Sequence, residues 1–340
     1  MNFKFMFYNL WLVGLIGAIY GKELVYTDLK TSDGSISSQI LKQMAVLSGA
    51  TVFIETGTAG GASTRSALDC FKEIHTVELD RGLYERAVGL FRPYQHVHVY
   101  WGDSGKTLMT ILPKIQGRVL FFLDAHYSGP GTACGEVMTP IKAELLAIKA
   151  SGIKDAIIFI DDMVWHHYNY GHERDYPNFV QLIDLLKEIN PTYQVVFLGD
   201  VMCGLPNDIR ISAMTGAIAK FLLPVKVGGW SIVDLKLLER AIKDASAEEK
   251  TTIFALQKRY EKNPFCDISP FNFFAGLVCE TTGRYRDAFD FYSRAIFLGM
   301  NDWSVRWLLA RVSKKCGDTR MAVTLSKKVH VEKTDFSEVL

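Results

Sequence analysis

The stretch Thr51-Val-Phe-Ile-Glu55-Thr-Gly57-Thr-Ala59-Gly60-Gly61-Ala-Ser63-Thr64 decides the fold of this chain. Its first four residues are rich in β-branched and aromatic side chains, which predicts a buried strand that ends at Glu55. A turn of small residues follows, and we expect a helix from about Ser63. Glycines let the backbone approach a ligand closely, and free amides at a helix start favour polar or anionic groups. The stretch therefore predicts a ligand-binding turn between a strand and a helix.

Apolar runs alternate with amphipathic segments along the next 160 or so residues. Apolar strands that follow helices in this way indicate a doubly wound, mostly parallel sheet. Strands are expected at 74–80, 97–100, 118–123 and 156–160, and helices at 35–47, 81–91, 106–112, 140–150 and 179–189. Two last strands, at 193–199 and 208–213, are joined by a short loop with Gly204, Pro206 and Asn207, which predicts an antiparallel hairpin at the end of the sheet.

The order Glu55-x-Gly57-x-Ala59-x-Gly61 places an acid just before the turn, unlike the dinucleotide pattern G-x-G-x-x-G. It resembles the first motif of the class I S-adenosylmethionine (SAM)-dependent methyltransferases, E/D-x-G-x-G-x-G, with Ala59 in place of the middle glycine. An acid at the strand end suits a ligand with a cationic amino group better than a pyrophosphate. The resemblance covers about residues 35–214, and it implies an α/β methyltransferase domain with SAM as its cofactor.

Two acids match positions at which this family binds the nucleoside. Glu78 ends the second expected strand, where a carboxylate can accept from both ribose hydroxyls, and Asp80 is the alternative. Asp103 follows the third strand, where the resemblance implies a contact with the adenine amino group, and it can also cap the next helix. The implied cofactor contacts are Glu55, Gly57, Thr58, Ala59, Gly61, Ser63, Glu78, Asp103, Ser104 and Asp124.

Acids also end the fourth and fifth expected strands, as Asp124 and then as Asp161 and Asp162. The carboxyl ends of parallel strands share one edge, so these acids should converge, and a divalent cation would relieve their repulsion. The arrangement resembles metal-dependent small-molecule O-methyltransferases, in which Mg²⁺ binds two substrate oxygens. The resemblance implies that Asp124, Asp161 and Asp162 bind Mg²⁺ or another divalent ion. Capping of helices and binding of water are the alternative roles.

His126 lies two residues after Asp124 and can reach the same edge. A neutral imidazole could take the proton from an acceptor hydroxyl, so His126 and Asp124 are the expected catalytic residues, with a structural histidine as the alternative. Catechol-type enzymes use a lysine near this position, and the chain departs from that pattern. The competing residues lie in a later aromatic loop, formed by Trp165, His166, His167, Tyr168 and Tyr170.

The C-terminal part is expected to be an all-α domain, with a helical linker at 215–264 and two tetratricopeptide-like repeats at 265–331. Small residues recur there with the spacing of that repeat, for example Gly283 with Gly317 and Ala288 with Ala322. Such repeats would offer a docking surface for a protein partner. A generic helical cap is the alternative.

Residues 1–22 combine Lys4 with an apolar run, which resembles a secretory signal peptide or a membrane anchor. An amphipathic helix is the alternative. SAM is made and used in the cytosol, so a membrane anchor that leaves the catalytic domain in the cytosol is favoured over export.

The net charge of +1 gives no argument for a nucleic acid partner, and the six cysteines contain no C-x-x-C pair for a metal-thiolate site. The expected function is SAM-dependent O-methylation of a small molecule or a sugar hydroxyl. Two alternatives remain open: a non-catalytic interaction protein with a relic nucleotide-binding domain, and a nucleotide or sugar-nucleotide enzyme.

Overall fold

The structure of the 340-residue chain is a computed structural model. It describes residues 23–25, 29–31, 34–163, 175–222, 232–261, 269–298, 300 and 303–330. The expected signal or anchor segment and the aromatic loop with His166 and His167 lie outside the described residues. The chain divides into two compact units, which meet in sequence between Ser212 and Ala213. Among the described residues, no helix combines the length and the apolar character needed to cross a membrane.

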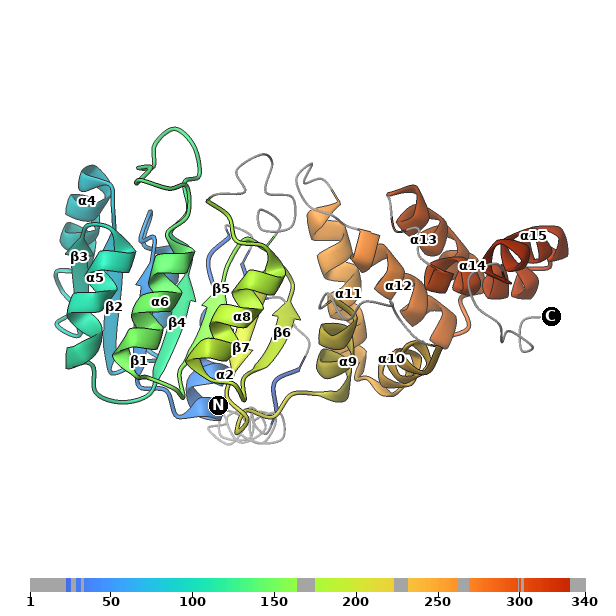
Figure 1. Cartoon of the computed structure of the whole chain (residues 1–340), viewed down its shortest axis with the longest axis horizontal. Helices are drawn as coiled ribbons and strands as arrows, with labels where there is room; N and C mark the ends of the chain where they lie inside the picture. The colour runs from blue at the N-terminus through green and yellow to red at the C-terminus, as the bar shows by residue number, and fades with distance from the viewer. Residues whose placement is uncertain are drawn as a thin grey trace, which may run out of the picture. The chain divides into compact units, whose positions relative to one another are not determined.

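The first unit is built on a seven-stranded sheet with the strand order β3-β2-β1-β4-β5-β7-β6 (Figure 1). Its parallel strands are β1 (Val52–Thr56), β2 (Glu73–Glu78), β3 (Val97–Trp101), β4 (Val119–Leu123) and β5 (Ile157–Ile160). The strand β7 (Val201–Leu205) runs antiparallel to both β5 and β6 (Gln194–Leu198). The expected doubly wound, mostly parallel sheet with an antiparallel hairpin at its end is therefore confirmed.

The expected position of the last strand is wrong. The second strand of the hairpin is Val201–Leu205, not 208–213, and the turn is formed by Gly199 and Asp200. Gly199 has a φ of +65°, which suits such a tight turn. Gly204 lies inside β7, where an added Cβ would come within 3.0 Å of the Leu186 side chain, so a close contact explains this glycine and a turn does not.

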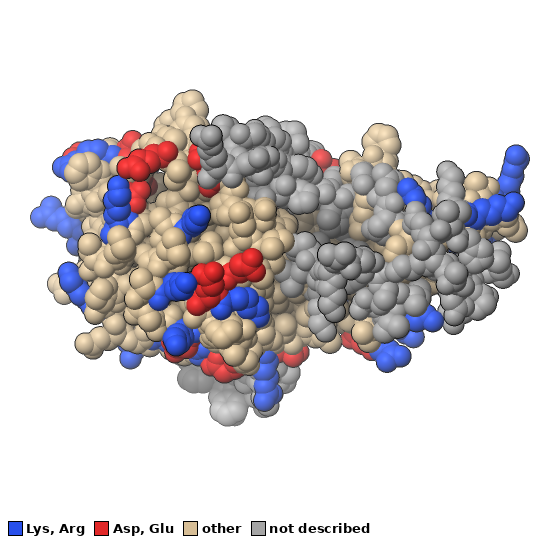
Figure 2. All heavy atoms as spheres, viewed as in Figure 1, with Lys and Arg blue, Asp and Glu red and all other residues tan. Residues whose placement is uncertain are grey.

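Helices cover the sheet on both faces. They are α2 (Ser38–Ser48), α3 (Ala62–Ala67), α4 (Arg81–Phe91), α5 (Ser104–Ile111), α6 (Ile141–Ser151) and α8 (Phe179–Ile189), with a 3₁₀ turn at Leu112–Lys114. The helices α5, α6 and α8 lie side by side on one face (Figure 1). Gly105 permits the close contact of α5 and α6, because a Cβ there would come within 2.6 Å of the Ala143 Cβ. On this face, basic and acidic side chains are interspersed (Figure 2).

The core of the first unit lies between the sheet and these helices. The strands β1, β4 and β5 are buried along their whole length, and Phe53, Phe121, Phe122 and Phe159 are among the largest fully buried side chains. Each such ring contributes roughly 1.5–3 kcal/mol through burial. The ends of these strands therefore have a rigid base on which side chains can be held in fixed positions.

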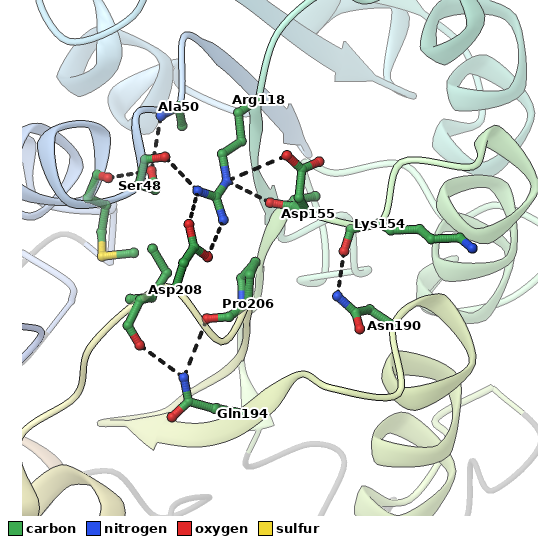
Figure 3. Close-up of polar contacts among 12 residues, drawn as sticks. Ser48, Ala50, Arg118, Lys154, Asp155, Asn190, Gln194, Pro206 and Asp208 are labelled. Atoms are coloured by element: carbon green, nitrogen blue, oxygen red, sulfur yellow. Dashed lines mark hydrogen bonds and ion pairs between the residues drawn. The ribbon is translucent and has the colours of Figure 1, made fainter.

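Arg118 immediately precedes β4 (Figure 3). It stabilises the end of the sheet at which the parallel strands begin, which we call the amino edge, and the opposite end is the carboxyl edge. Its guanidinium makes a bidentate contact with Asp208, at 2.6 and 2.8 Å. It also donates to the carbonyl oxygens of Ser48, at 2.7 Å, and of Asp155, at 2.8 Å. One side chain thus ties the segments before β1 and β5 to the segment after β7.

The second unit is helical in its described residues, as expected for the C-terminal part. Its helices are α9 (Ala213–Leu222), α10 (Ile232–Asp244), α11 (Ala247–Tyr260), α12 (Ser269–Thr281), α13 (Tyr285–Phe297), α14 (Trp303–Lys315) and α15 (Thr319–His330). Gly283 and Gly317, at φ +80° and +87°, lie in the turns between α12 and α13 and between α14 and α15. Gly276 lies directly against the ring of Tyr292, so α12 and α13 pack closely. Membership of the tetratricopeptide family stays a prediction.

Candidate functional site

A pocket of about 590 Å³ opens where the parallel strands of the first unit end. The turn after β1 forms one wall, and the ends of β2, β4 and β5 contribute acids. All of the sequence-predicted site residues line it except Gly61: Glu55, Gly57, Thr58, Ala59, Ser63, Glu78, Asp103, Ser104, Asp124, His126, Asp161 and Asp162. Gly61 instead has φ +73°, and a Cβ added there would lie 2.9 Å from the ring of Phe91.

The turn after β1 brings the backbone close to its neighbours. Gly57 has φ +84°, and a Cβ there would lie 2.5 Å from the Asp124 carbonyl oxygen, so only glycine fits. Ala59 adopts φ +44°, which is unusual for a residue with a Cβ. Its amide donates to the Glu78 carboxylate at 2.8 Å, and this hydrogen bond fixes the turn. Around an added Cβ at Gly60, in contrast, no atom lies within 4 Å.

Glu55 is a buried carboxyl group at the base of the pocket. It accepts hydrogen bonds from the hydroxyls of Thr64 and Thr76, the latter at 2.9 Å. Burial raises its pKa to about 8, although both hydroxyl contacts act in the opposite direction. Glu55 is therefore largely protonated at neutral pH unless a cationic group approaches it.

Glu78 and Asp103 lie at the ends of β2 and β3 and face the same pocket. The two carboxylate oxygens of Glu78 accept from the amides of Ala59 and Asp80, both at 2.8 Å, so its orientation is fixed. Asp103 caps α5 by accepting from the Lys106 amide at 2.9 Å while it also lines the pocket. The expected capping role of Asp103 is thus present, and a contact with adenine stays a prediction.

Sequence reasoning missed a buried acid behind Ser104. Glu144, on α6, accepts from the Ser104 hydroxyl at 2.5 Å. Burial raises the pKa of Glu144 to about 7, against the effect of hydrogen bonds from Ser104 and Thr56. Helical periodicity alone gave no signal for it, because its partner lies 40 residues away.

His126 lies between two carboxylates. Its Nδ1 is 3.3 Å from Asp124 Oδ1, and its Nε2 is 3.0 Å from Asp162 Oδ2. Burial alone would lower the pKa of His126, but the Asp124 hydrogen bond and the two negative charges outweigh it and raise that pKa. Burial raises the pKa of Asp124, because it disfavours the charged carboxylate. The Ser128 hydroxyl is 3.2 Å from the same Nε2, so a hydroxyl can reach this nitrogen.

Lys30 is the second basic residue at this edge, and sequence reasoning also missed it. Its Nζ lies 2.5 Å from Asp161 Oδ1, 2.9 Å from Asp162 Oδ1 and 3.8 Å from Asp200 Oδ2. Asp161 belongs to the end of β5 and Asp200 to the turn between β6 and β7, whereas Lys30 precedes α2 by several residues. No local pattern in the sequence connects these segments, which explains why Lys30 and Asp200 were not predicted.

Two groups of side chains in the described part of the chain have ligand atoms close enough to share a metal ion. They are Asp124 with His126 and Asp162, and Asp161 with Asp162 and Asp200. The predicted set, Asp124 with Asp161 and Asp162, combines members of both groups. Lys30 Nζ lies within 3 Å of Asp161 Oδ1 and Asp162 Oδ1, so an ion bound to these two oxygens would overlap the ammonium group. Lys30 does not exclude an ion from the group of Asp124, His126 and Asp162 in this way, and metal binding by the predicted ligands stays a prediction.

No protein-family model and no curated protein matches the sequence. Solved structures with some similarity include methyltransferases. An O-methyltransferase from Bacillus cereus in complex with S-adenosylhomocysteine (SAH) is 15% identical, with a TM-score of 0.39, over 58% of this chain and 90% of that one. The O-methyltransferase TomG from Streptomyces achromogenes, in complex with SAM, is 15% identical, with a TM-score of 0.32, over 50% and 79%. These similarities are too weak to assign an activity.

Proposed function

We propose that the first unit is a SAM-dependent methyltransferase that modifies a hydroxyl oxygen of a small molecule or a sugar. One observation carries the proposal: a single pocket brings the turn after β1, Glu78 and Asp103 together with the group of Asp124, His126 and Asp162. The first set suits an adenosine-containing ligand, and the second suits proton transfer. When bound, SAM supplies an electrophilic methyl group on a positively charged sulfur.

The space and the charges around the expected cofactor contacts support the proposal. The space above Gly60 leaves room for a ligand against the backbone, and Glu78 is oriented by two amides toward the pocket that it lines. Glu55 would meet the cationic amino group, and this approach would favour the ionised form of its carboxyl. Asp103 and Ser104 complete the expected contacts.

His126 would act as the base in its neutral form, which becomes populated as the pH rises above its raised pKa. An acceptor hydroxyl that takes the position of the Ser128 hydroxyl would lie within hydrogen-bonding reach of Nε2. Nε2 would take the proton of the hydroxyl that accepts the methyl group. Asp124 at Nδ1 and Asp162 beside Nε2 would stabilise the imidazolium that forms. A protein partner for residues 265–331 and a membrane or export role for residues 1–22 stay predictions.

Calorimetric titration with SAH tests the cofactor assignment without knowledge of the acceptor. We expect one binding site, and Glu78→Ala should weaken binding about 30-fold or more because buried charged contacts are worth ~2 kcal/mol or more. Glu85→Ala is the matched control, since Glu85 is an exposed acid paired with Arg81 on α4. Absence of SAH binding by folded protein would remove the proposal.

A further inference from the structure

We infer that Lys30 is the built-in cation of the acid cluster formed by Asp161, Asp162 and Asp200, and that it takes the place of a divalent metal ion there. The inference goes beyond the sequence, which predicted a metal. Its cation-binding part depends on geometry alone, and its consequence for catalysis rests on the proposed function.

The first step is the placement of the ammonium group. Lys30 Nζ has carboxylate oxygens of Asp161 and Asp162 at 2.5 and 2.9 Å, and one of Asp200 at 3.8 Å. Its side chain is only 9% exposed, and those of Asp161 and Asp200 are 3% and 9% exposed. Buried charges in such proximity attract strongly, so the ammonium group is firmly held.

The second step is steric exclusion. A Mg²⁺ ion binds carboxylate oxygens at roughly 2.0–2.1 Å. An ion bound to the oxygens of Asp161 and Asp162 that contact Lys30 would overlap the ammonium group, given the 2.5 and 2.9 Å separations. Lys30 and a metal ion at this position therefore exclude each other.

The third step is the backbone that holds the cluster together. Lys30 lies in a short antiparallel bridge with Ile36, which fixes it before α2. The Asp162 amide donates to Asp161 Oδ1 at 2.7 Å, and Asp162 has φ +53°, a conformation that residues with a Cβ rarely adopt. The Met163 amide donates to the Asp200 carbonyl oxygen at 3.1 Å, which joins the β6–β7 turn to the end of β5.

Asp162 links Lys30 to His126, the expected base. Lys30 contacts Asp162 Oδ1, and His126 Nε2 contacts Asp162 Oδ2. Lys30 is thus a positioning residue, because it holds the carboxylate against which the imidazole is placed. Under the proposed function, methyl transfer should need no divalent ion at the cluster of Asp161, Asp162 and Asp200.

Binding of Mn²⁺, measured by the loss of its free-ion paramagnetic resonance signal, tests the inference. The full-length wild-type chain should show no site below about 1 mM that Asp200→Asn removes, whereas Lys30→Ala should gain one such site with a dissociation constant of ~0.1 mM or below. Asp200→Asn in the Lys30→Ala background should weaken that site at least tenfold. Lys149→Ala, which breaks an exposed pair with Glu188, is the matched control and should gain nothing.

Lys30→Gln offers a second variant that retains a polar side chain, and circular dichroism checks that each variant is folded. Wild-type binding of Mn²⁺ that Asp200→Asn abolishes would overturn the inference, and so would two folded Lys30 variants that gain no site. SAH calorimetry in EDTA separates the two proposals. If SAH does not bind, the methyltransferase proposal fails while the Mn²⁺ result still stands.

Discussion

The two edges of the central sheet differ in how their charges are balanced. At the amino edge, Arg118 faces Asp208 in a bidentate pair, and this contact lowers the pKa of Asp208 and raises that of Arg118 (Figure 3). At the carboxyl edge, burial raises the pKa of Asp124 and that of Asp161, which signals carboxyl groups that are costly to ionise.

The difference shows how one sheet divides two tasks. Matched charges at the amino edge stabilise the fold. At the carboxyl edge, crowded acids with raised pKa values are costly to ionise, and a cationic ligand can lower that cost. The backbone follows the same division: the unusual φ values of Ala59 and Asp162 both lie at the carboxyl edge. Substitutions at the two edges should therefore affect different measurements.

The largest expected effect is on turnover at the carboxyl edge. His126→Ala should lower methyl transfer from labelled SAM into a metabolite extract by about 10²–10⁴-fold, because the base is lost. SAH affinity should stay within about threefold of wild type, since His126 is not among the expected cofactor contacts. Ser128→Ala is the control and should retain transfer. Full activity of His126→Ala would show that another group takes the proton.

At the amino edge, Arg118→Ala should destabilise the fold and leave ligand binding intact. The loss should be about 3 kcal/mol, because three hydrogen-bonding partners lose their donor and two of them are carbonyl oxygens near strand starts. Urea unfolding measures it. Arg118→Lys should retain only part of the free energy of unfolding that Arg118→Ala loses, since an ammonium group cannot reproduce the bidentate contact. An unchanged unfolding midpoint would mean that this edge does not support the sheet.

A smaller effect concerns Glu144, the buried acid under Ser104. Its pKa is about 7 in the folded chain and 4.5 ordinarily, so the native state retains a proton that the unfolded state releases. Stability should therefore fall as pH rises from about 4.5 to 7, by on the order of 2 kcal/mol at pH 6. Glu144→Gln should make this dependence shallower in urea unfolding at pH 4.5 and 6, while the contribution of Glu55 remains in both proteins. The same slope in both proteins would contradict the raised pKa.

Much of the fold followed from the sequence because β1, β4 and β5 are buried on both faces and appear as apolar runs that end in acids. The turn from Gly57 to Gly61 was located by its small residues, and α3 begins at Ala62, one residue before the expected start. The last strand was misplaced because Pro206 and Asn207 gave a stronger turn signal than Gly199 and Asp200, the residues that form the turn.

The carboxyl edge was only half predictable. Glu78, Asp124, Asp161 and Asp162 end strands, and the topology of a parallel sheet alone brings strand ends together. Lys30 enters from a segment without regular secondary-structure pattern, and its contact with Asp162 spans 132 residues of sequence. Contacts between residues so far apart in the sequence leave no local pattern, so only the folded chain shows them.

A crystal structure of the full chain grown with saturating SAH tests the carboxyl edge most directly. The ligand should occupy the pocket after β1, with its ribose hydroxyls on Glu78 and its adenine toward Asp103. An empty pocket in such crystals, or SAH bound elsewhere on the molecule, would contradict the assignment of this edge as the cofactor site.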